Sequence, residues 1–99
     1  MNVTFEYIGW CNEKDSKGDH DKVWAAFKMG NSWYACWGAR GKTVNFKKHD
    51  SFNSLRRVID SKRGKYGEVS ETKLLDIWPD FYDSVESRLV FCTLANKIM

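Results

Sequence analysis

Three stretches of the first half of the chain divide into two alternating sets of side chains: residues 3–8 and 22–29, where hydrophobic and polar positions mix, and residues 33–37, which are apolar throughout. In the first two stretches the odd-numbered positions are all apolar and share one face of an extended segment. In the third stretch Trp33 and Trp37 fall on the same face. This period of two predicts β-strands, and the short connections between them predict an antiparallel sheet.

Glycine-containing turns separate these predicted strands. The connection Gly30-Asn31 between the second and third strands suits a tight hairpin, because glycine supplies the positive φ that its first position needs. Gly38 and Gly41 flank a basic turn, after which residues 43–47 resume an extended pattern. We therefore expect a sheet of about four strands.

A helix follows the predicted sheet. Asp50 or Ser51 can cap a helix that begins at Phe52, and Gly64 can end it. Apolar positions recur at helical spacing within this segment and include Leu55. Such a helix crosses the sheet and completes a compact core.

The last third of the chain predicts a C-terminal helical extension at residues 72–99. A helix from about Asp80 places Phe81 and Val85 on one apolar face. This extension either packs on the free face of the sheet or joins a second subunit, which would form a homo-oligomer. We expect a single domain over residues 1–99 with an α+β fold: a small antiparallel sheet, one crossing helix and a C-terminal helix.

The distribution of charge adds a second kind of information. The whole chain has a formal net charge of +3. Residues 28–65 contain ten Lys or Arg against two acidic residues, a net charge of +8, whereas residues 1–27 carry −2 and residues 66–99 carry −3. A basic block of this kind predicts a positive face and an anionic partner.

The sequence shows no catalytic constellation, metal site or cofactor motif. The polar segment 12–21 predicts a loop, and its acidic residues lack the spacing of a calcium-binding EF-hand. His20 and His49 each precede an Asp, but adjacent residues rarely face each other, and a triad needs a third member. The three cysteines lack the spacing of a zinc site. We therefore expect a protein that is not an enzyme and holds neither metal nor cofactor.

The same sequence features bear on location. No apolar run approaches the ~20 residues that span a bilayer, and the N-terminus has no signal-peptide pattern. An odd number of cysteines suits a reducing compartment. We therefore expect a cytoplasmic protein that does not enter a membrane.

The region around the basic turn carries a family resemblance. Trp37-Gly38 followed by Arg40-Gly41 resembles the Trp-Gly-Arg signature of WGR domains, which are small modules of poly(ADP-ribose) polymerases and several bacterial proteins. The resemblance covers residues 20–67, a WGR-like core of about half the chain. Within it, Lys22-Val23-Trp24 opens a hairpin strand as in the family, and residues 62–66 are similar to the family's closing Lys-x-x-Lys-Gly-Tyr.

This resemblance implies a nucleic-acid-binding module. In the polymerases the domain contacts DNA ends through its motif Trp and Arg, which implies a ligand contact for Trp37. The family places arginine directly after the Trp-Gly pair, whereas this chain has Ala39 there and Arg40 one position later. End-specific DNA recognition is therefore not carried over, and both RNA and DNA remain candidate ligands.

Residue chemistry indicates the same site. Trp37 offers a flat surface that can stack on bases or sugars, and nearby cations can hold phosphates. We expect Arg40, Lys42, Arg56 and Arg57 to lie on one positive face. The predicted nucleic-acid-binding residues are Trp37, Arg40, Lys42, Lys47, Lys48, Arg56, Arg57, Arg63 and Lys65.

Two alternatives stay open at this point. The chain could be a protein-interaction or inhibitor module, for example a phage or mobile-element accessory protein that blocks a host nucleic-acid enzyme. Its positive face would then dock on an acidic or nucleic-acid-occupied site of the target. In the other alternative Trp37 belongs to the core, and the basic residues only protect a sheet edge from aggregation.

Overall fold

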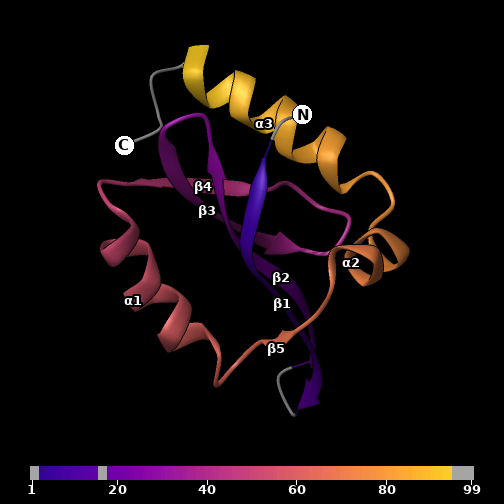
Figure 1. The fold of residues 1–99 in the computed structure, drawn as a ribbon. Coiled ribbons are helices and arrows are strands. Elements are labelled where there is room, and N and C mark those ends of the chain that lie inside the picture. Colours follow the sequence, from indigo (N-terminus) through magenta and orange to yellow (C-terminus); the bar gives the residue numbers. More distant parts are fainter. Residues whose placement is uncertain (1–2, 16–17, 95–99) are drawn as a thin grey trace.

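Five strands and three helices make up the described part of the chain, residues 3–15 and 18–94 of a computed structural model (Figure 1). They are β1 (Thr4–Asp15), β2 (Gly18–Met29), β3 (Ser32–Ala39), β4 (Asn45–His49), α1 (Phe52–Lys62), β5 (Gly67–Glu68), α2 (Glu71–Ile77) and α3 (Phe81–Leu94). The strands form one antiparallel sheet in the order β4-β3-β2-β1-β5. The predicted α+β fold is confirmed, with β5 as a fifth strand of only two residues.

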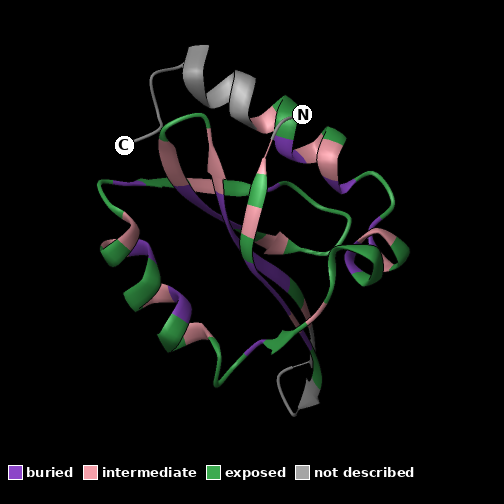
Figure 2. Cartoon of the chain, in the orientation of Figure 1, coloured by how far each residue is buried: buried purple, intermediate pink, exposed green. Residues whose placement is uncertain are grey.

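The sheet buries both of its faces, and each face has its own hydrophobic cluster. On the α1 face, the buried residues are Tyr7, Cys11, Trp24, Ala26, Ala35, Leu55, Ile59 and Tyr66. On the α2/α3 face, they are Ile8, Val23, Ala25, Phe27, Tyr34, Cys36, Val44, Leu74, Trp78, Phe81 and Val85. Figure 2 shows buried segments running along the central strands and along the sides of the helices that meet them. One sheet therefore serves two cores.

The hairpin between β2 and β3 follows its predicted geometry. Met29 pairs with Ser32, which leaves Gly30 and Asn31 as a two-residue turn. Gly30 has a φ of +62°, a conformation that costs other residues more than glycine. The predicted faces of the two strands are confirmed, because their alternating residues fall in the two separate clusters.

The hairpin between β1 and β2 is longer than predicted. The predicted loop at residues 12–21 is wrong over most of its length, because the antiparallel pairing of β1 with β2 continues to the Asp15–Gly18 pair. Residues 16–17 lie outside the described part. Beyond the hydrophobic core, these strands are held together by backbone hydrogen bonds. The sequence therefore shows no alternation of apolar residues that would predict strands there.

An irregularity in β1 changes the face that its side chains occupy. Phe5 pairs with Phe27 but Tyr7 pairs with Ala26, so the register shifts by one residue between them. Phe5 therefore packs against the α2/α3 cluster, and Tyr7 belongs to the α1 cluster. The prediction of one face for both residues is wrong, because a bulge reverses the side-chain alternation without changing the residue types.

Local signals set the limits of α1. The Ser51 hydroxyl accepts a hydrogen bond from the backbone N–H of Ser54 at 3.1 Å, so Ser51 and not Asp50 is the N-cap. Leu55 is fully buried against the sheet. The helix ends at Lys62, two residues before the predicted glycine.

The C-terminal segment packs on the chain's own sheet. In Figure 1, α2 and α3 lie on the side of the sheet away from α1. Their buried residues complete the α2/α3 cluster, so the first of the two predicted arrangements is the one observed. Residues 95–99 of the predicted 72–99 extension lie outside the described part, and a homo-oligomer through this segment stays a prediction.

We expect Leu55→Ala to lower the free energy of unfolding by about 2–5 kcal/mol, because it opens a cavity between α1 and the sheet. Arg56→Ala at the exposed neighbouring position is the control and should change the same quantity by less than ~0.5 kcal/mol. Urea denaturation measures both variants. A loss for Leu55→Ala no larger than that of the control would contradict the packing of α1 on the sheet.

Candidate functional site

Trp37 lies at the surface, on the α1 face of the sheet. It pairs with Trp24 of β2 and with Asn45 of β4. Its exposed fraction is 37%, whereas that of Trp24 is 3%. Among the described side chains, Trp37 is the one large hydrophobic residue that is exposed. Its indole ring is therefore accessible to a ligand in the folded protein.

A cavity of about 220 Å³ opens beside Trp37, between α1 and the sheet. We call it the Trp37 cavity. Its lining residues are Trp24, Ala35, Trp37, Lys47, His49, Val58, Lys62 and Tyr66. Ala35 lies between Trp33 and Trp37 on the same face of β3, and its small side chain leaves space that larger neighbours would fill.

Two lysines line this cavity, and a third lies against one of its aromatic rings. Lys47 and Lys62 line it, and Lys62 Nζ lies 5.9 Å from the centroid of the Tyr66 ring. Lys65 Nζ lies 5.7 Å from the same ring centroid. Within the described part of the chain none of these three lysines forms an ion pair. Their charges therefore remain available to an anion.

His49 provides a polar group in the cavity. Its side chain is only 6% exposed, and its Nδ1 lies 3.1 Å from the Ser54 hydroxyl. Burial lowers the pKa of the imidazole and the positive charge of Lys47 lowers it further, while Asp50 acts in the opposite direction. No hydrogen bond joins Nε2 to a described residue. The ring is thus neutral near pH 7 and has one nitrogen left for a ligand.

Arg40, the arginine of the motif region, is engaged within the protein. Its Nε lies 2.7 Å from Asp21 Oδ2, and its Nη1 donates to the backbone carbonyl of Ile77 at 3.2 Å. The other carboxylate oxygen of Asp21 accepts a hydrogen bond from the indole N–H of Trp10 at 2.7 Å. Arg40 therefore ties the β3–β4 turn to β2 and to the end of α2, and its charge is already compensated.

Gly38, the glycine of the Trp-Gly pair, has a packing role. A Cβ at this position would lie 2.6 Å from the backbone carbonyl oxygen of Thr43. The segment before β4 approaches the end of β3 too closely for any side chain there. This part of the motif therefore fixes the chain path directly after Trp37.

Arg63 lies on the opposite flank of α1 from the cavity. Its guanidinium carbon is 5.0 Å from the centroid of the Tyr7 ring. Its nitrogens lie 3.5 Å from a carboxylate oxygen of Glu68 and 3.7 Å from one of Asp60. Arg63 therefore links α1 to β1 and β5, and its charge is shared with two acidic residues.

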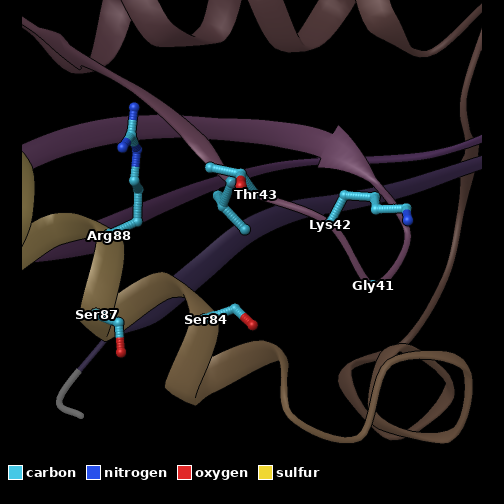
Figure 3. Close-up of a pocket in the computed structure, with 7 residues that line it drawn as sticks. Gly41, Lys42, Thr43, Ser84, Ser87 and Arg88 are labelled. Carbon is cyan, nitrogen blue, oxygen red and sulfur yellow. The ribbon is translucent and has the colours of Figure 1, made fainter.

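Lys42 and Lys48 lie away from the Trp37 cavity. Lys48 pairs with Tyr34 in the β3–β4 ladder and so belongs to the α2/α3 face. Lys42 lines a second, open pocket of about 550 Å³ with Thr43 and three residues of α3 (Figure 3). In Figure 3 the Lys42 ammonium and the Arg88 guanidinium point in different directions from opposite ends of this pocket. They do not converge on one anion.

The prediction that Arg40, Lys42, Arg56 and Arg57 share one positive face is wrong. Arg40 contacts the end of α2 and Lys42 faces α3, whereas Arg56 and Arg57 are exposed on α1, across the sheet. The physical reason is that the helices cover opposite faces of the sheet. At about 100° per residue, Arg57 lies about 160° from both Leu55 and Ile59 and so points away from the sheet, whereas Arg56 lies on the flank of the Tyr7 contact.

The predicted site residues do not include His49 and Lys62, the two other ionisable groups besides Lys47 and Tyr66 that line the cavity. Lys62 follows Val58 by four positions, which puts both on one flank of α1. His49 follows Lys47 by two positions, which puts both on one face of β4. These spacings are visible in the sequence, but they identify a site only once α1 is known to lie over that face.

Comparisons with protein-family models, with curated proteins and with solved structures find no match for this chain. The resemblance to WGR domains therefore stays a prediction. In the part of the chain that the structure describes, no group of three or more His, Cys, Asp or Glu is placed to hold a metal ion. No described helix has the length and hydrophobicity to cross a membrane.

We expect the burial of neutral His49 to make the fold less stable as the pH falls below about 6.5. The unfolded chain takes up a proton near the ordinary pKa of 6.5, whereas the folded state resists it, so the unfolded state binds more protons in this range. His49→Gln should remove this part of the pH dependence, while the control His20→Gln should retain it. Urea unfolding between pH 8 and 5 measures the effect, and identical profiles for wild type and His49→Gln would contradict it.

Proposed function

We propose that this protein binds nucleic acid, RNA or DNA, without catalysing a reaction, through Trp37 and the lysines around the Trp37 cavity. The observation that carries the proposal is the exposed indole beside a cavity that Lys47 and Lys62 also line. Nucleic-acid-binding surfaces combine aromatic rings, on which bases stack, with cations that follow the phosphate backbone. Both elements meet at this site.

The balance of charge supports the same site. Arg40 and Arg63 pair with acidic residues of the protein, whereas Lys47 and Lys62, which line the cavity, form no ion pair with a described residue. Two uncompensated positive charges therefore lie at the cavity rim. A polyphosphate chain is attracted to such a rim, and its binding releases counterions.

A nucleotide suits this site better than an acidic protein surface does. An acidic surface could meet the lysines, but it would leave the aromatic walls of Trp24, Trp37 and Tyr66 without a flat partner. A nucleotide brings a flat base and a phosphate in one unit. The protein-interaction alternative therefore becomes an outcome of the test and not the proposal.

Trp37→Ala should cost about 1–3 kcal/mol of binding to a fluorescein-labelled oligonucleotide, because a stacking surface is lost. Lys47→Gln should reduce the slope of log affinity against log salt by about 0.7. The matched control is Lys48→Gln, which makes the same charge change one residue away on the opposite face. Fluorescence anisotropy across a salt series measures all three variants, and thermal unfolding confirms that each is folded.

Two results would contradict the proposal. The first is no binding of DNA or RNA by the wild-type protein at low salt. The second is an equal loss of affinity for Lys47→Gln and Lys48→Gln together with no loss of affinity for folded Trp37→Ala. That result would indicate nonspecific attraction of a polyanion to a basic protein.

A further inference from the structure

We infer that the Trp37 cavity receives one unpaired nucleobase, which makes single-stranded nucleic acid the ligand class of this protein. The inference rests on the proposed function and adds to it. Stacking on an exposed ring needs only a surface, whereas the structure has a cavity next to that ring. Its size, its walls and the position of its polar groups each point to a single base.

The size of the cavity limits its occupant. Its volume of about 220 Å³ equals the liquid volume of roughly seven water molecules. One flat base with the edge of its sugar fits such a space, whereas a stack of two bases does not. A peptide helix or a folded loop is also too large to enter.

The walls provide the stacking surface. Trp37 is partly exposed at the mouth, and Trp24 and Tyr66 are buried further in. A base that enters from the mouth therefore meets aromatic rings along its path, with the methyl groups of Ala35 and Val58 beside it. Aromatic rings bind any of the four bases in this way, so the walls give affinity with little sequence preference.

The polar groups of the cavity lie at different depths, which matches the separation of base and phosphate in a nucleotide. His49 is buried, and its Nε2 has no hydrogen bond to a described residue, so it can meet the hydrogen-bonding edge of a base. Lys47 and Lys62 carry long flexible side chains with their charges at the end, which suits phosphates at the mouth. The base edge then lies inward and the backbone lies outward.

This arrangement excludes the duplex as the preferred ligand. A base in a double helix is stacked and paired, and it reaches a cavity only after rotation out of the helix, at a cost in free energy. A base in a single strand avoids the loss of pairing. The protein should therefore prefer unpaired segments over duplex of the same length and composition.

The first experiment uses the wild-type protein and changes only the ligand. A labelled twelve-residue oligothymidylate is compared by fluorescence anisotropy with the same backbone in which every base is replaced by an abasic tetrahydrofuran. Oligouridylate, a DNA duplex of equal length and free thymidine monophosphate are the other arms. We expect the abasic strand and the duplex to bind at least about fivefold more weakly than the oligothymidylate at equal salt.

The second experiment fills the cavity. Val58→Phe places a ring in the cavity from the half-buried flank of α1, and Asn53→Phe is the control that adds the same ring at an exposed position of α1 outside the cavity lining. We expect Val58→Phe to lose the difference between the oligothymidylate and the abasic strand, while Asn53→Phe retains it. Circular dichroism confirms the fold of both variants, and the first experiment does not depend on either.

The outcomes separate this inference from the proposed function. Equal affinity for the abasic strand and the oligothymidylate, or for the duplex and the single strand, overturns the base cavity and leaves nucleic-acid binding in place. If thymidine monophosphate binds as tightly as the oligothymidylate, the inference that the ligand is a nucleic-acid strand is overturned. Absence of binding to every oligonucleotide at low salt overturns both proposals.

Discussion

Burial of the central sheet on both faces is the constraint on which the rest of this structure depends. β2 and β3 carry apolar residues at odd and even positions alike, so both faces of the sheet must be shielded from water. α1 covers one face, and α2 and α3 cover the other. On the α1 face the cover leaves a cavity where Ala35 is too small to fill the space under α1 and Trp37 remains exposed. The candidate site is thus the unfilled part of one core, held by the same packing that stabilises the fold.

This constraint explains which features the sequence could predict. Residues 22–29 and 33–37 read as extended apolar segments on either side of Gly30-Asn31, so the two faces of β2 and β3 and the two-residue turn at Gly30 were predictable. The register shift after Phe5 was not, because a bulge depends on pairing with the partner strand. The extension of β1 and β2 beyond the core was missed for a related reason: backbone hydrogen bonds leave no hydrophobic pattern.

The basic residues show the same limit of prediction from sequence for the candidate site. Ten cations in one segment predict an anionic partner, but their distribution over faces depends on where each helix lies. Arg40 turns to Asp21, and Lys48 lies on the opposite face from its neighbour Lys47. The sequence identified Trp37 and Lys47, which the structure brings to one cavity, and it missed His49 and Lys62. Sequence composition therefore leads to the proposed ligand class, and only the packing of α1 shows which of these residues lie around one cavity.

The central claim is that nucleic acid binds on the α1 face at Trp37 and not on the α2/α3 face. The most direct measurement is a titration of ¹⁵N-labelled protein with a short single-stranded oligonucleotide, followed through the indole N–H signals of its five tryptophans. The account predicts a large shift for Trp37 with little change for Trp78, which is buried on the opposite face. Shifts centred on the backbone amides of Lys42, Ser84 and Arg88, with Trp37 unchanged, would contradict it and place the ligand in the second pocket.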